Sequence, residues 1–171
     1  DHTIATALLD LRLLCGERAL YDHFCSYWDA RRHKIYTAQW IRTKLQECDL
    51  RHFKQGDSRF LVEPNVKENK GGLRDLHLLH WLARGVYHAP SVQSLIALNK
   101  LDTSEYRQYQ RAHRFLALVR IHLHRLTGRS DERLSFDRQT EIAGLMGFRR
   151  EIDHQPVERF MKRYFQIVRS V

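Results

Sequence analysis

The chain has 171 residues, of which 43% are hydrophobic and 29% are charged. This balance excludes a disordered chain. A mean hydropathy of −0.55 and the lack of any apolar run of about 18 residues exclude a membrane-spanning protein. Eight glycines and three prolines are few for this length, which disfavours a multi-stranded barrel or sandwich and favours long helices in an all-α bundle.

The formal charge of +9 suits a polyanion, a nucleotide or an acidic protein surface as partner. Cys15, Cys25 and Cys48 lack Cys-x-x-Cys spacing, so we expect reduced thiols in a cytoplasmic protein, without a zinc site or a disulfide framework. The chain carries no signal peptide and starts at Asp1 rather than Met, which suggests one domain excised from a larger protein.

Helical spacing of apolar residues predicts the elements of the first half of the chain. We expect a first helix from Ile4 to Cys15 that Gly16 ends, a second that carries Leu20, Phe24 and Tyr27, and a third that ends near Phe53. Residues 59–62, just before a proline, form the one short stretch expected to be extended.

The second half is expected to be helical as well. A short helix follows Pro90, and a long helix capped by Asp102 runs to Gly128. The apolar seam of this long helix consists of Tyr109, Ala112, Leu116, Val119, Leu123 and Leu126. Two more helices follow, one ended by Gly147 and one that starts near Pro156 and carries Val157, Phe160, Met161, Tyr164 and Val168 inward.

The segment from Glu63 to Asp75, here called the Gly-Gly loop, is the most unusual part of the sequence. Gly71 and Gly72 stand where a helix starts, so their backbone N–H groups and the helix dipole favour an anion there. The cationic residues Lys67, Lys70 and Arg74 are predicted to converge on the same phosphate. The alternative is an ordinary turn with solvated lysines, in which Glu63 and Asp75 pair with the cations.

The helix after Asp75 is apolar nearly all round, as buried helices are, except for a polar stripe of His77, His80 and Arg84. We expect this stripe to line a cleft rather than to bind a metal, because the two histidines have no third ligand nearby. The full set of expected cleft-lining residues is Glu63, Asn65, Asp75, His77, Arg84, Arg120 and Arg133.

A second polar cluster follows the long helix. Arg120 and His124 share one helix face, Asp131 or Asp137 is expected to cap the next helix, and Leu134 with Phe136 is expected to enter the core. No Asp-x-Asp, His-Asp, Gly-x-Ser-x-Gly or Walker-type motif occurs anywhere in the chain. We therefore expect neither a complete catalytic centre nor a metal or cofactor held by this chain.

Several stretches resemble the bifunctional uridylyltransferase/uridylyl-removing enzymes that modify the bacterial nitrogen-regulatory protein PII. The hallmark segments are Glu63–Lys67, Lys70–Leu76 and Arg133–Gln139, and the stretches Thr6–Arg12 and Val157–Phe165 fit as well. Glutamine-synthetase adenylyltransferases carry a similar Gly-Gly-x-Arg-Asp signature, but the first and third segments favour the uridylyltransferases.

The resemblance implies that residues 1–171 form one helical, substrate-binding domain beside a nucleotidyltransferase domain and a His-Asp hydrolase domain. Such a domain would help to bind UTP or PII while the parent enzyme, with magnesium present, transfers UMP to a tyrosine of PII. On its own the domain would be inactive. Two alternatives stay open. One is a non-catalytic scaffold that transmits glutamine regulation. The other is a basic nucleic-acid-binding module, which is disfavoured because the arginines of the long helix spread round its circumference.

Overall fold

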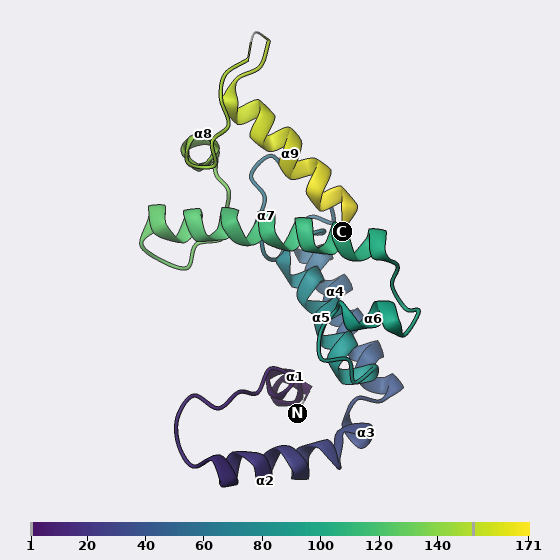
Figure 1. Cartoon of the computed structure of the whole chain (residues 1–171). Helices are drawn as coiled ribbons and strands as arrows, with labels where there is room; N and C mark the ends of the chain where they lie inside the picture. Colours follow the sequence, from purple (N-terminus) through teal and green to yellow (C-terminus); the bar gives the residue numbers. More distant parts are fainter. Residues whose placement is uncertain (1, 152) are drawn as a thin grey trace. The chain divides into compact units, whose positions relative to one another are not determined.

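A computed structural model of the chain describes residues 2–151 and 153–171. It is all-α, as predicted, and the described residues contain no β-strand (Figure 1). Its helices are α1 His2–Leu8, α2 Arg18–Asp29, α3 Arg32–Ile35, α4 Ala38–Lys54, α5 Leu73–Val86, α6 Ser94–Ala97, α7 Thr103–Thr127, α8 Phe136–Leu145 and α9 Pro156–Ser170. In the part of the chain described, no helix combines the length and the apolar character needed to cross a membrane.

The chain divides into two compact units. The first comprises the residues up to Glu47 together with Leu78–Lys100, and the second comprises Cys48–His77 together with Leu101–Val171. Each unit has its own hydrophobic core.

The core of the first unit is built around Trp40, which is fully buried. Tyr36 packs edge-on against it, with ring centroids 5.1 Å apart, and donates its hydroxyl hydrogen to the carbonyl oxygen of Ala5 at 2.8 Å. Gly85 allows this packing, because a Cβ there would lie 3.1 Å from the Tyr36 ring. The basic residues Arg32, His33 and Lys34, just before α4, belong to the short helix α3.

The first helix is shorter than predicted, since it ends at Leu8 rather than at Cys15. The N–H groups of Leu9, Asp10 and Leu11 bond to carbonyls three residues back, which closes the helix in a tight turn. This turn buries Leu9 and brings Asp10 to 2.8 Å from the His80 ring. Leu11 and Cys15, which were predicted to belong to the first helix, therefore lie outside it.

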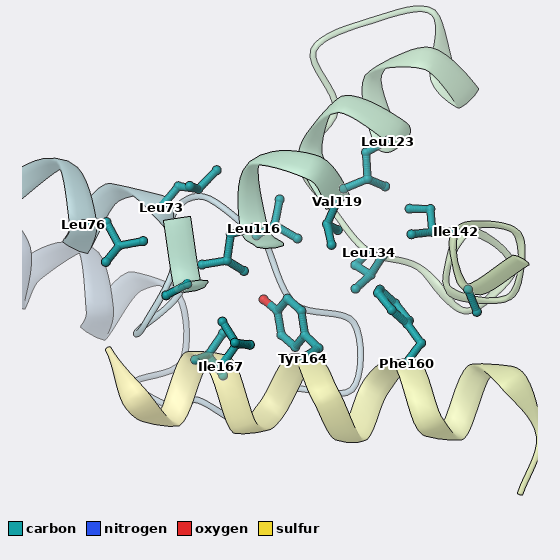
Figure 2. Close-up of a cluster of buried hydrophobic side chains, with 14 residues drawn as sticks. Leu73, Leu76, Leu116, Val119, Leu123, Leu134, Ile142, Phe160, Tyr164 and Ile167 are labelled. Atoms are coloured by element: carbon teal, nitrogen blue, oxygen red, sulfur yellow. The ribbon is translucent and has the colours of Figure 1, made fainter. Parts of the chain in front are cut away.

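The second unit is held together by α7, α8 and α9. Figure 2 shows α7 side chains such as Leu116 and Val119 pointing toward Phe160, Tyr164 and Ile167 of α9. The predicted seam of α7 is confirmed from Ala112 to Leu123, whereas Leu126, in the last turn, is exposed.

Both ends of α7 are as predicted. The Asp102 carboxylate accepts the Glu105 N–H at 2.8 Å, and the Glu105 carboxylate accepts the Asp102 N–H at the same distance. At the other end, Gly128 adopts the left-handed conformation, with φ +64°.

The surface of α7 corrects one inference from the sequence. At about 100° per residue, Arg107, Arg111, Arg114 and Arg125 fall on one face of the helix, and all four are exposed. The arginines are therefore not spread round the circumference; Arg120 alone of the five lies elsewhere and pairs with Glu132. Leu118 and Ile121 interrupt the basic face between Arg114 and Arg125.

Residues 59–62, expected to be extended, belong to no β-strand. Extended pairing occurs slightly later, where Asn65 forms an isolated antiparallel bridge with Arg133. The Val66 N–H donates to the Glu132 carbonyl, and the Leu134 N–H donates to the Pro64 carbonyl, both at 2.9 Å. The Gln139 side-chain N–H also donates to the Val62 carbonyl at 2.7 Å. We call this pairing of residues 62–66 with residues 132–139 the clasp.

A residue of the clasp, Glu63, caps the start of α8, whereas Asp131 and Asp137 were the predicted caps. Glu63 accepts the N–H of Phe136 at 3.1 Å, while Asp131 pairs with Arg129 and Arg138. Leu134 is fully buried as predicted, but Phe136 is 60% exposed because it is the first residue of the helix and points away from the core.

Candidate functional site

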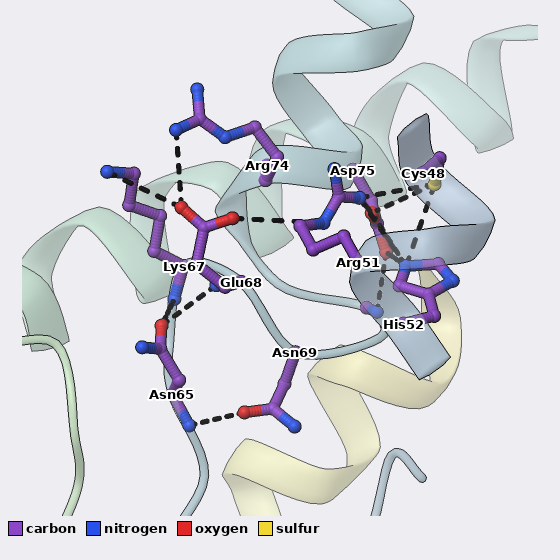
Figure 3. A network of polar contacts seen from close by, with 10 residues as sticks. Cys48, Arg51, His52, Asn65, Lys67, Glu68, Asn69, Arg74 and Asp75 are labelled. Atoms are coloured by element: carbon purple, nitrogen blue, oxygen red, sulfur yellow. Dashed lines mark hydrogen bonds and ion pairs between the residues drawn. The ribbon is translucent and has the colours of Figure 1, made fainter. Parts of the chain in front are cut away.

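The Gly-Gly loop folds around two asparagines. Asn65 Oδ1 accepts the N–H groups of Lys67 and Glu68 at 3.0 and 2.8 Å, and Asn69 Oδ1 accepts the Asn65 N–H at 2.5 Å (Figure 3). Asn69 is buried and donates its side-chain N–H to the Gln55 carbonyl at 3.2 Å. These bonds replace a regular element, so the loop has a defined conformation without being helical.

Both glycines are required by close packing. Gly71 has φ +79°, and a Cβ there would lie 2.2 Å from the Val168 carbonyl oxygen of α9. A Cβ at Gly72 would lie 2.8 Å from the carbonyl oxygens of Asn69 and Lys67. The Gly71 N–H donates to Asp75 Oδ2 at 2.7 Å and the Gly72 N–H to the Asn69 carbonyl at 2.8 Å. An anion would have to compete with these acceptors, and a phosphate role for the two N–H groups stays a prediction.

Two of the three predicted phosphate-binding cations lie together. Lys67 Nζ is 3.5 Å and an Arg74 guanidinium nitrogen 3.2 Å from the same oxygen of Glu68 (Figure 3). Arg51 Nε lies 3.8 Å from the other oxygen, so three cations surround one carboxylate. The side chains of Lys67 and Arg74 are 26% and 30% exposed, and both are therefore accessible from solvent.

The third cation, Lys70, contacts a different carboxylate. Its ammonium lies 2.8 Å from Asp57, and this bond lowers the pKa of Asp57 below its ordinary value. The three cations therefore do not converge on one point in this conformation.

Asp75 is the centre of a second group of side chains, which the sequence analysis did not assemble. His52 Nε2 lies 3.0 Å from both Asp75 oxygens, Cys48 Sγ lies 3.6 Å from Oδ1, and the Arg51 guanidinium bonds to Oδ1 as well. Burial raises the pKa of the Cys48 thiol, and the nearby Asp75 charge raises it further. Cys48, Arg51 and His52 share one face of α4 at helical spacing, which is the only sequence signal for this group.

The other expected cleft-lining residues belong to separate contacts. Arg133 pairs with Glu63 at 2.7 Å, and the pKa of Glu63 is lowered by the Phe136 N–H and by Arg133. The ring of His77 is tilted by 57° against that of His113, with ring centroids 6.3 Å apart. Arg84, in the first unit, lies 3.8 Å from Asp10 and donates to the Pro90 carbonyl.

Arg120 and His124 do share a face, as predicted, and Glu132 is their common partner. The carboxylate lies 2.8 Å from Arg120 and 3.2 Å from His124. Burial raises the pKa of Glu132, but the bond and the charge of Arg120 outweigh burial and lower it. Glu132 was not a predicted site residue.

The residues described offer no oxygen-only ligand set for magnesium. Their one group of three metal-ligating side chains, Cys48, His52 and Asp75, contains a thiol and an imidazole, whereas magnesium takes oxygen ligands. We therefore assign no step of this chain to the magnesium that the resemblance implies.

Comparisons with known proteins identify the family. The family model described as GlnD PII-uridylyltransferase matches residues 39–171. Proteins named bifunctional uridylyltransferase/uridylyl-removing enzyme are 47% identical in Nitrobacter winogradskyi, 46% in Bradyrhizobium sp. strain BTAi1 and 43% in Rhodopseudomonas palustris, over all 171 residues. The chain spans 18% of the length of these relatives, and no solved structure matches it significantly. With a family match over most of its length, the chain belongs to the PII-uridylyltransferase family.

Proposed function

We propose that this chain is the helical, substrate-binding part of a bifunctional uridylyltransferase/uridylyl-removing enzyme of nitrogen regulation. The observation that carries the proposal is 47% identity along the whole chain to a protein of that name. In this proposal, a neighbouring nucleotidyltransferase domain transfers UMP from UTP to a tyrosine of PII, and a His-Asp domain removes it. The chain itself contributes binding, because it contains neither an Asp-x-Asp nor a His-Asp motif.

Within this function, Lys67 and Arg74 bind the phosphates of UTP. Each lies within 3.5 Å of Glu68 and is partly exposed, and the two carry more positive charge than that one carboxylate neutralises. Glu68 holds the two side chains at a common point, where a phosphate can bridge the ammonium and the guanidinium fork. Positive charge at this position would stabilise the pyrophosphate that leaves when UMP is transferred.

Lys70 would join these two only if it leaves Asp57, since its ammonium is 2.8 Å from that carboxylate. An acidic segment of PII is the other ligand that the same cations suit, because a carboxylate and a phosphate accept the same guanidinium hydrogen bonds.

The second candidate function is an interdomain scaffold. The N–H groups of both glycines have acceptors inside the chain, and the Gly-Gly loop is joined to residues 132–139 through the clasp. Both observations suit a rigid connector. Under this alternative, changes in the loop alter stability or regulation and leave nucleotide affinity unchanged.

Titration of the ¹⁵N-labelled chain with UTP and magnesium, followed by NMR, separates the two functions. Binding predicts saturable shifts from Lys67 to Leu76 that are lost when Lys67 and Arg74 are both changed to alanine. The matched control is Arg18→Ala, which removes an exposed arginine that pairs with Asp22 in the other unit. Shifts with UTP but not with uridine indicate phosphate recognition, whereas no shift at millimolar UTP favours the scaffold.

Activity provides the second test. In a full-length enzyme that carries this segment, Arg74→Ala is expected to reduce uridylyl transfer, and an unchanged rate would remove the phosphate role. A similar titration with PII in place of UTP tests the acidic-segment alternative.

A further inference from the structure

The side chains around Asp75 have the composition and spacing of a zinc site. Cys48 and His52 lie one turn apart on α4, and Asp75 lies in the first turn of α5. Cys48 Sγ is 3.7 Å from His52 Nε2 and 3.6 Å from Asp75 Oδ1, and His52 Nε2 is 3.0 Å from Asp75 Oδ1 (Figure 3). All three come from the second unit.

These separations agree with those in tetrahedral zinc sites. Bonds of about 2.3 Å to sulfur and about 2.0–2.2 Å to nitrogen or oxygen place the ligand atoms roughly 3.3–3.6 Å from one another. The observed separations differ from that range by a few tenths of an ångström, so the three ligand side chains themselves need only small adjustments. A water molecule would complete the four ligands.

The surroundings support the same assignment. The second oxygen of Asp75 accepts the Gly71 N–H at 2.7 Å, which fixes the carboxylate with Oδ1 toward Cys48, while His52 lies 3.0 Å from both oxygens. Such outer hydrogen bonds orient the ligands of metal sites. The side chains of His52 and Asp75 are only 13% and 15% exposed, so water competes weakly for the ion.

A cationic group already lies where the ion would lie. One guanidinium nitrogen of Arg51 contacts Asp75 Oδ1 and is 3.1 Å from Cys48 Sγ and 3.5 Å from His52 Nε2. The Asp75 carboxylate therefore already holds a cation next to the space between the three ligand atoms. Arg51 also has another acidic neighbour, since its Nε lies 3.8 Å from Glu68.

We propose that Cys48, His52 and Asp75 bind one Zn²⁺, which displaces the Arg51 guanidinium from Asp75. The thiol loses its proton to solvent as the zinc–sulfur bond forms. The neutral imidazole of His52 binds through Nε2 and carries its hydrogen on Nδ1, and Arg51 moves to Glu68. The charges balance in both states: Arg51 neutralises Asp75 without the metal, and Zn²⁺ neutralises the thiolate and the carboxylate when it is bound. This site departs from the expectation that the chain binds no metal, and its three ligands are not among the residues proposed to bind UTP.

Cobalt titration tests the site directly, because tetrahedral Co²⁺ with a thiolate ligand has intense charge-transfer and visible bands. The 171-residue chain is expected to bind one equivalent of Co²⁺ with these bands, and Zn²⁺ should abolish them. Cys48→Ala or His52→Ala should weaken binding by roughly 100-fold, because each removes a ligand and loss of an outer hydrogen-bond partner alone costs about 10–100-fold. Cys25→Ala, the matched control in the first unit, should leave binding unchanged, and Arg51→Ala should tighten it.

A second measurement needs no variant. Mass spectrometry of the alkylated wild-type chain reports each of the three cysteines, and Zn²⁺ is expected to protect Cys48 while the exposed Cys15 and the half-buried Cys25 react as before. Equal reactivity of Cys48 with and without Zn²⁺ overturns the proposal. Cobalt binding without charge-transfer bands, or binding that Cys48→Ala leaves unchanged, overturns it as well.

Discussion

Gly71→Ala is expected to destabilise the second unit more than its backbone conformation alone requires. A left-handed conformation costs an L-residue about 1–2 kcal/mol. The new Cβ would also lie 2.2 Å from the Val168 carbonyl oxygen, so the loop and α9 must separate by nearly an ångström. Overpacking of this kind costs about 1–3 kcal/mol. Together the two costs come to about 2–5 kcal/mol.

Gly147→Ala provides the matched control. Gly147 has φ +77°, against +79° for Gly71, and a Cβ there meets nothing within 4 Å. Its substitution should therefore cost only the conformational part, about 1–2 kcal/mol, and lack the overpacking cost of Gly71→Ala.

Urea unfolding followed by far-ultraviolet circular dichroism measures the difference. With a slope of about 2 kcal/mol per molar urea, the midpoint of Gly71→Ala should lie about 1 M below that of Gly147→Ala. All three tryptophans belong to the first unit, so their fluorescence serves as an internal reference. Equal midpoints for the two variants would refute the argument that contact with α9 requires glycine at position 71.

Two further predictions concern the same unit. Leu116→Ala should reduce the free energy of unfolding by about 3 kcal/mol, because Leu116 is fully buried. Leu118→Ala, at a site 40% exposed on the same helix, should reduce it by less than about 1 kcal/mol. Similar urea midpoints for the two variants would contradict the assigned core. Because the pKa of Glu132 is lowered below its ordinary 4.5, the folded state binds this proton less readily than the unfolded state does. Its stabilising contribution is therefore present above pH 4.5 and is lost as the pH falls through the lowered value. Urea midpoints measured across this pH range should fall less steeply for Glu132→Gln than for the wild type, and parallel curves would exclude Glu132 as a source of acid sensitivity.

Elements with a long apolar period could be predicted from the sequence. The seam of α7, its Asp102 cap and its end at Gly128 all depend on residues within one or two helical turns, and so does the start of α9 at Pro156. Local spacing was insufficient at α1, where the chain leaves the helix after Leu8 so that Leu9 can enter a core formed by distant residues.

The candidate site was only partly predictable, for the same reason. The Gly-Gly loop stood out by its composition, but the partners of its charged residues lie far along the chain. Asp75 contacts residues 23 to 27 positions earlier, and Glu63 holds a helix that starts 73 positions later. Such pairings depend on how the loops fold back, which the spacing of residues within one element does not determine.

The clasp has a consequence for the tolerance of the chain to insertions. Its Glu63–Arg133 bond closes a loop of 70 residues, and that loop includes the whole excursion Leu78–Lys100 into the first unit. Loop-closure entropy grows only with the logarithm of length, so doubling such a loop costs about 0.6 kcal/mol. The segment Leu78–Lys100 can therefore change in length between relatives with little loss in the stability of the Gly-Gly loop. Because the contacts of the clasp join residues far apart in the sequence, we expect the second unit to fold slowly.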